Sequence, residues 1–179
     1  MFKTIAGIEL VQSVDPILLG WIDEERAATE GGLLENHDYV DLRGFGFDEV
    51  EDVYAHEAEI FDRISMGIDD KEFDDLIVEF DETYFLPLEV GIVSGVLAVS
   101  ALGCVPITSC RGNTLHDRHR FDAPTILFYA RPEHLATLLV AARAAGVSIV
   151  NNNDKVELYS DDIRKIHAFA LAIIKDVKS

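Results

Sequence analysis

Apolar and polar positions follow clear patterns after residue 87, which makes this part of the chain the easiest to interpret. The apolar stretch 88–102 predicts a helix buried on most sides, and Gly103 predicts its end because glycine adopts a positive φ at low cost. Short runs rich in β-branched and aromatic residues predict strands over 105–109 and 125–130. We therefore expect two strands after the buried helix.

The remaining C-terminal pattern adds a helix, a hairpin and a final helix. Pro132 is placed to open a helix and Gly146 to close it. The runs 147–150 and 155–159 flank residues that tolerate turns, so they predict a β-hairpin. Ser160 is the expected N-cap of the last helix. This order of elements predicts an α/β fold, with α+β as the alternative, in which helices cover a mixed sheet.

The first half of the chain predicts more helix than strand. Apolar residues three to four positions apart, with acids between them, predict an amphipathic helix from Asp48 as N-cap to about Gly67 and a second one over 70–80. The other elements expected in this half, in chain order, are a strand over 3–11, a helix over 17–28 and a strand over 37–45.

The net charge of −18 is concentrated in the first half of the chain. Residues 1–86 hold 24 Asp or Glu against 5 Lys or Arg, whereas residues 87–179 hold 9 against 10. Such a surface repels phosphate backbones and anionic membranes, so nucleic-acid binding through this half is disfavoured. It favours a basic protein partner, with solubility as the alternative reason for the charge. We expect residues 1–86 to form an acidic α/β subdomain or cap on the core layer 87–179, the two together making one compact domain.

Composition also bears on compartment and membrane contact. The two cysteines, Cys104 and Cys110, lie at either end of an expected strand and are too far apart to bridge, which predicts reduced thiols and a cytoplasmic protein. The uncharged run 90–107 has the length of a membrane span, but glycine, serine and proline residues dilute it. We expect a buried helix and strand there, and no membrane segment.

The best candidate for a functional site is the turn that ends the strand over 105–109. It brings a hydroxyl, a thiol and a guanidinium to a strand end, where ligands of α/β proteins commonly bind, and Gly112 allows its amides to face an anion. Basic residues follow at once, and Arg131 comes later. These observations predict a pocket for an anion or a phosphorylated metabolite. Its candidate residues are Thr108, Ser109, Cys110, Arg111, Gly112, His116, Arg118, His119 and Arg120.

Other chemistry at this turn remains open from the residues alone. Cys110 is either a nucleophile, with His116 as its base, or a small buried apolar side chain. A metal site made of Cys110, His116 and His119 has suitable ligand types, but its spacing matches no closed zinc motif, so no metal is expected.

Residues 86–179 resemble a group of small, mostly uncharacterised bacterial and phage α/β proteins. In that group an apolar helix leads to a T-x-S-C-x-G-type turn or a close variant, which corresponds here to residues 108–112. The same stretch is distantly similar to the Ser-Ser-Cys-Ser-Gly segment of the methyltransferase family that completes wybutosine in transfer RNA, with Arg111 in place of its second-to-last Ser. This resemblance implies an α/β fold and an S-adenosylmethionine site near residues 108–112.

Two functions follow from these patterns. The first is a non-catalytic protein-binding or inhibitory protein, of the immunity, inhibitor or antiviral defence-accessory type, that holds its acidic half against a basic partner. The alternative is a small-ligand-binding protein or transferase-type enzyme centred on residues 108–112. The sequence leaves the cofactor and the oligomeric state open.

Overall fold

The computed structural model of the chain describes residues 2–23, 42, 44–84, 88–115 and 121–179. Its centre is a five-stranded mixed sheet in the order β1-β4-β5-β3-β2. β1 runs parallel to β4, and all other neighbours are antiparallel. The strands are β1 (Gln12–Ser13), β2 (Val105–Cys110), β3 (Thr125–Tyr129), β4 (Ser148–Asn152) and β5 (Lys155–Tyr159). The α/β fold with a mixed sheet is thereby confirmed.

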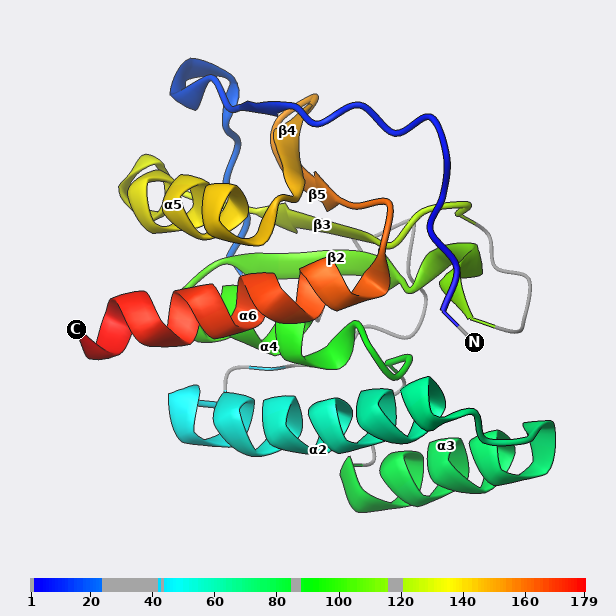
Figure 1. Cartoon of the computed structure of the whole chain (residues 1–179). Coiled ribbons are helices and arrows are strands. Elements are labelled where there is room, and N and C mark those ends of the chain that lie inside the picture. Colours follow the sequence, from blue (N-terminus) through cyan, green and yellow to red (C-terminus); the bar gives the residue numbers. More distant parts are fainter. Residues whose placement is uncertain (1, 24–41, 43, 85–87, 116–120) are drawn as a thin grey trace.

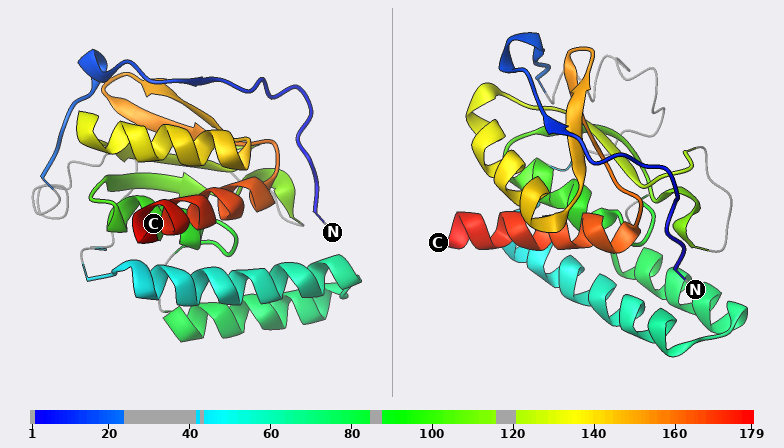
Figure 2. Two further views of the ribbon diagram at one scale, coloured as in Figure 1. Left: turned by 60° about the vertical axis from the view of Figure 1, so that its left-hand side comes forward. Right: turned by 45° about the horizontal axis from the view of Figure 1, so that its top comes forward.

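Helices cover one face of this sheet in two layers (Figure 1 and Figure 2). α4, α5 and α6 lie against the sheet, α2 packs against α4 and α6, and α3 runs antiparallel along the outer side of α2. We call the α2–α3 pair, residues 47–84, the acidic hairpin. The helices are α2 (Phe47–Met66), α3 (Asp70–Tyr84), α4 (Val93–Ala101), α5 (Leu135–Ala145) and α6 (Ile163–Lys178), with short 3-10 turns at Pro16–Leu18, Gly112–Thr114 and Pro132–His134.

The elements expected after residue 87 are confirmed, with one shortened helix. Gly103 and Gly146 end α4 and α5 with φ of +97° and +68°, as expected. The helix expected over 88–102 begins only at Val93, because Gly91 adopts a φ of +93°, which an α-helix does not allow. Gly91 is also enclosed, since a Cβ there would lie 2.8 Å from Ile163. A close approach of α6 therefore determines where α4 starts.

Near the N-terminus the expected elements differ from the structure where it describes the chain. Residues 3–11 form no strand, and only Gln12–Ser13 pairs with the sheet. Gly7 has a φ of +83° in a turn that interrupts the expected strand. Of the helix expected over 17–28, the described residues 17–23 contain only the end of the 3-10 turn Pro16–Leu18, and residues 24–28 lie outside the described part of the chain. Most of the strand expected over 37–45 also lies outside the described residues.

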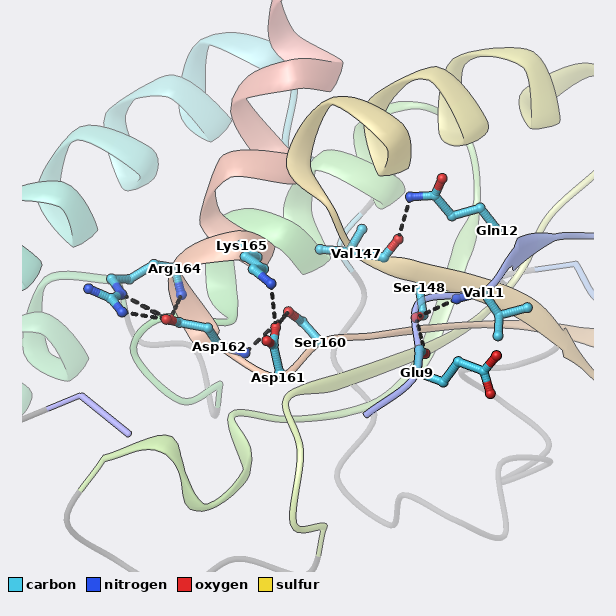
Figure 3. A network of polar contacts seen from close by, with 10 residues as sticks. All are labelled: Glu9, Val11, Gln12, Val147, Ser148, Ser160, Asp161, Asp162, Arg164 and Lys165. Carbon is cyan, nitrogen blue, oxygen red and sulfur yellow. Dashed lines mark hydrogen bonds and ion pairs between the residues drawn. The ribbon is translucent and has the colours of Figure 1, made fainter. Parts of the chain in front are cut away.

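Side chains attach this N-terminal segment to the sheet where backbone pairing is sparse. The Ser148 hydroxyl donates to the Glu9 carbonyl and accepts from the Val11 amide, both at 3.1 Å (Figure 3). The Gln12 side-chain amide donates to the carbonyls of Ala142 and Val147 at 2.9 Å. These contacts place β1 at the edge beside β4.

Both expected helix caps lie two residues from their predicted positions. Gly46 caps α2, and its N–H donates to the Glu49 carboxylate at 2.9 Å, so that Asp48 stands in the first turn. Asp162 caps α6 and accepts from the Arg164 amide at 2.9 Å. Ser160 instead accepts from the Asp162 amide at 3.2 Å and so supports the cap from outside the helix (Figure 3).

The described parts of both chain halves contribute to one hydrophobic core. Side chains with no more than 1% exposure come from every layer of helices, among them Ile60 of α2, Phe80 of α3, Leu97 of α4, Leu138 of α5 and Phe169 of α6. Within this core lies one fully buried carboxylate, that of Glu57 on α2. The acidic hairpin is therefore joined to the sheet layer by apolar packing and by a buried charge-bearing group.

The Glu57 carboxylate caps the N-terminus of α4 from a neighbouring helix. Its Oε1 accepts from the amides of Gly91 at 2.7 Å and Val93 at 3.1 Å, and its Oε2 accepts from the Ser94 amide at 3.2 Å. Two of the amides that a helix start leaves without partners, those of Val93 and Ser94, are satisfied in this way, together with the preceding amide of Gly91. Burial raises the pKa of Glu57 from its ordinary value of 4.5 to about 7, although the hydrogen bonds act in the opposite direction.

This raised pKa predicts a pH-dependent stability that Glu57→Gln removes. Between pH 4.5 and 7 the folded state keeps a proton that the unfolded state has released, so stability falls as pH rises. We therefore compare the free energy of unfolding of the wild type with that of Glu57→Gln. The wild-type value minus the variant value should decrease by about 3 kcal/mol between pH 4.5 and 7 and stay constant above pH 7. Urea unfolding at a series of pH values measures both proteins.

Glu59→Gln is the matched control, because Glu59 lies on the exposed face of the same helix. Its stability relative to the wild type should change much less with pH. A difference between wild type and Glu57→Gln that is constant from pH 4.5 to 7 contradicts the prediction.

Candidate functional site

The turn predicted to bind a ligand lies at the end of β2, which is an edge strand of the sheet. Thr108 and Ser109 are half-buried, whereas Cys110, Arg111 and Gly112 are buried. Cys110 pairs with Thr125 at the start of β3. The five residues thus lie together at a strand end, as expected, but most of their surface faces the protein.

The backbone amides of this turn are already hydrogen-bonded inside the chain. The Arg111 amide donates to the Glu89 carboxylate at 2.8 Å, and the Gly112 amide donates to the Cys110 sulfur at 3.4 Å. The Asn113 amide donates to the Asp122 carbonyl at 2.8 Å. The anion next to the turn is therefore the chain's own Glu89, and a bound anion would have to replace it.

Gly112 is required by packing as well as by backbone conformation. It has a φ of +66°, and a Cβ there would lie 2.4 Å from the Ala123 carbonyl carbon and 2.6 Å from the Pro124 nitrogen. Real Cβ atoms do not approach backbone so closely. The glycine thus permits the segment leading into β3 to pass directly over the turn.

The Cys110 thiol has the environment of a buried, protonated group. Its residue is 6% exposed, and burial above all raises the thiol pKa, with a smaller contribution from Glu89. Hydrogen bonds from the amides of Phe121 and Gly112 act in the opposite direction. Cys104 and Cys110 are both free, in agreement with the expected reduced thiols. A nucleophile, in contrast, needs a lowered thiol pKa.

The basic residues expected beside the turn are only partly accounted for. His116, Arg118, His119 and Arg120 lie outside the described residues. Arg131, which we grouped with them, follows β3 and lies at the other end of β2, because antiparallel pairing puts Tyr129 opposite Val105. Within the described ranges, no group of three or more His, Cys, Asp or Glu residues could hold a metal ion.

A group of ionisable and aromatic side chains lies at that other end of β2. The Cys104 thiol is 3.4 Å from His134 Nδ1, which also accepts from the Arg131 amide at 3.2 Å. The Arg131 guanidinium lies 4.0 Å from the centre of the Trp21 ring. Beside these residues is a hollow of about 310 Å³, whose lining includes Trp21, Gly103 and Cys104.

No pattern along the sequence predicts this hollow. Residues 21, 104 and 131–134 are far apart along the chain, and no motif or spacing connects them. Only the pairing of β2 with β3 and the path of the N-terminal segment bring them together. The one available signal was that residue 131 follows an expected strand, since strand ends are common ligand sites.

No protein-family model, curated protein or solved structure matches this chain. The predicted resemblance to the wybutosine methyltransferase family therefore remains a prediction. Within the described ranges, none of the helices combines the length and the apolar character that crossing a membrane requires. The uncharged run 90–107 is divided between α4 and β2.

The packing of Gly112 predicts a strong effect of Gly112→Ala on stability. The methyl group meets rigid backbone at a positive φ, so we expect the free energy of unfolding to fall by about 2–4 kcal/mol in urea titrations. Gly146→Ala is the control, since its φ is also positive but a Cβ there meets nothing within 4 Å. It should cost only about 1 kcal/mol. Equal losses in the two variants would refute the packing argument.

The burial of both cysteines predicts slow reaction with a thiol reagent in the native state. Cys104 is 1% exposed and Cys110 6% exposed, and burial raises both thiol pKa values, that of Cys104 to about 12. We expect an aromatic disulfide reagent at pH 8 to modify two thiols per chain in urea but almost none in buffer. Fast native modification that Cys110→Ser abolishes would instead identify a reactive Cys110.

Proposed function

We propose that this chain is a non-catalytic protein that binds a basic surface of a protein partner through the outer face of its acidic hairpin. The observation that carries this proposal is the excess of exposed carboxylates on α2 and α3. The hairpin holds 15 Asp or Glu against 2 Lys or Arg. The exposed acids are Asp48, Glu49, Asp52, Glu59, Asp62, Asp69, Asp70, Asp74, Asp75, Glu79 and Glu82.

The few cations of the hairpin are engaged in ion pairs with its own acids. Arg63 pairs with Glu72 at 2.5 Å, and Lys71 pairs with Asp75 at 2.6 Å. One further cation approaches from α6, where Lys178 lies 2.6 Å from Glu51. The acids nevertheless far outnumber these cations, so the face retains a strong negative potential that attracts a basic partner.

The arrangement of charge on α3 opposes the stability of the helix itself. Asp70 and Asp74, and likewise Asp75 and Glu79, are like charges four residues apart. The last turn of α3 has no basic residue and carries Glu82, where the helix dipole favours a cation. Solubility does not require carboxylates at these unfavourable positions. Their placement supports a binding role for the face.

Exposed apolar side chains lie among these acids. Val78 on α3 is 55% exposed, and Met66 at the end of α2 is 82% exposed. Val78 shares the outer stripe of α3 with Asp74, Asp75 and Glu82. Protein-binding surfaces typically combine an apolar area, which is buried on contact, with surrounding charges that guide association.

An inhibitory role of the immunity or defence-accessory type follows from the chemistry of the partner. Large basic surfaces on proteins commonly serve to bind nucleic acid or other anions. An acidic helix pair that covers such a surface competes with that anion. The predicted function is therefore inhibition by occupation, which needs no catalytic group on this chain.

The proposal predicts that charge reversal on α3 removes binding, whereas equal charge reversal elsewhere does not. Asp74→Lys with Glu79→Lys changes the outer face, and Glu9→Lys with Glu133→Lys changes exposed acids outside the hairpin by the same total charge. Each protein is immobilised, exposed to an extract of its native cell, and analysed by quantitative mass spectrometry. A partner should be retained by wild type and control, lost by the α3 variant, and released between about 50 and 300 mM salt.

Purified partner and titration calorimetry then confirm the direct contact. The α3 variant should bind at least about tenfold more weakly than the control, since two ion pairs at an interface are lost. If no retained protein distinguishes the α3 variant from the control, the proposed function is wrong.

A further inference from the structure

The hollow beside Trp21 has the size and lining of a small-molecule site. Its volume of about 310 Å³ is at the lower end of the range for such sites, roughly 300 to 1,000 Å³. Among the described residues, those that line it come from three parts of the chain: residues 21 and 23, residues 42 and 45, and residues 100, 101 and 103–105. Its apolar lining consists of Leu42, Phe45, Ala101 and Val105, beside the Trp21 ring.

The segment that carries Trp21 is held in place by contacts on both sides of it. Ile22 packs against Val105 and Ile107 of β2. The Gly20 amide donates to the Asp154 carbonyl at 2.7 Å, in the turn between β4 and β5. The wall of the hollow is thereby fixed to the sheet, as a preformed site requires.

His134 provides a hydrogen-bond donor next to Gly103 and Cys104, two residues that line this hollow. Because Nδ1 accepts from the Arg131 amide at 3.2 Å, the neutral ring carries its proton on Nε2. Burial above all lowers the pKa of His134, which keeps the ring neutral. Nε2 lies 3.3 Å from the position that a Cβ on Gly103 would occupy, and Gly103 itself lines the hollow. The absence of a side chain at Gly103 thus leaves the Nε2 edge of the ring uncovered.

Arg131 supplies a positive charge at the same place. Its guanidinium lies 4.0 Å from the centre of the Trp21 ring, which orients it beside the hollow. The side chain is 50% exposed, and its ion pair with Glu133 is long, at 3.9 Å. A planar guanidinium next to an imidazole N–H is a combination that recognises a carboxylate.

Asp23 limits the charge that a ligand can carry. It lines the same hollow, so a ligand with two negative charges would be repelled. This repulsion increases with the charge of the ligand, and the Arg131 guanidinium offers a monoanion a direct contact away from Asp23. This balance favours a monoanion over a phosphate dianion.

We propose that the hollow binds a small monocarboxylate with an apolar body, whose carboxylate contacts Arg131 and His134 and whose body lies among Leu42, Phe45, Ala101 and Val105. Cys104 is not a nucleophile in this site. Its sulfur lies 3.4 Å from His134 Nδ1 and packs against the ring, which helps to fix the orientation of the ring. The site is independent of the acidic hairpin.

Trp21 is the only tryptophan of the chain, so its fluorescence reports on this hollow alone. The probes are acetate, hexanoate, benzoate and phenylacetate, each compared with its neutral amide, together with phenyl phosphate. We expect a saturable fluorescence change with at least one acid, with a Kd of about 1 mM or below for the best one. Its amide should bind about tenfold more weakly, since it lacks the charge-assisted contact.

Variants locate the binding. Arg131→Gln should weaken binding of the acid about tenfold and remove the preference over the amide, whereas Arg143→Gln, at an exposed position of α5, should bind as the wild type does. Ala101→Leu should abolish binding by filling the hollow. Titration calorimetry checks each Kd without relying on Trp21, and melting temperatures verify folding. If Ala101→Leu fails to fold, the comparison of Arg131→Gln with Arg143→Gln still tests whether the acid binds at the hollow.

Three results would overturn the inference. The first is that none of the four acids saturates at about 10 mM. The second is that acids and amides bind equally well, or that Arg131→Gln binds as tightly as Arg143→Gln. The third is that phenyl phosphate binds more tightly than every carboxylate. None of these results bears on the acidic hairpin, which the extract experiment tests separately.

Discussion

A buried carboxylate joins the two layers of helices in this protein. The Glu57 side chain extends from α2 and accepts hydrogen bonds from backbone amides at the start of α4. Glu57 is fully buried. A helix start that is buried needs partners for its amides, and α4 has no side chain of its own that caps it. Without Glu57, both α4 and the attachment of the acidic hairpin would lose their polar contact in the core.

The segment before α4 contains a second carboxylate that accepts from backbone, that of the half-buried Glu89. The Glu89 carboxylate accepts a hydrogen bond from the Arg111 amide. Gly91, two residues after Glu89, donates its amide N–H to the Glu57 carboxylate. The start of α4 is therefore linked through Glu57 to the acidic hairpin and through Glu89 to the end of β2. Glu57 and Glu89 therefore act within the fold by accepting from backbone amides, whereas most acids of α2 and α3 are exposed to water.

The direction of β2 separates the two places where ligand chemistry is concentrated. At its end, the turn over 108–112 is filled by Glu89, by the Cys110 sulfur and by the segment leading into β3. At its start, Cys104 and His134 lie beside an open hollow that Trp21 and Arg131 flank. The turn that the sequence favours as a ligand site thus has its amides occupied within the chain, whereas the hollow lies beside residues that no sequence motif marks.

The sequence by itself determined the elements whose causes are local. The period of apolar residues located α2, α3, α5 and α6, and Gly103 and Gly146 marked helix ends because their backbone conformation excludes most other residues. Tertiary structure decided everything that depends on distant partners. α4 starts at Val93 because Gly91 has a positive φ at a place where Ile163 of α6 leaves no room for a Cβ. Residues 3–11 form no strand and are held by single hydrogen bonds, such as that of the Lys3 amide to the Thr114 carbonyl and that of the Ile149 amide to the Val11 carbonyl. The hollow at Trp21 exists because antiparallel pairing joins residues 104 and 134, a long-range contact that no local pattern encodes.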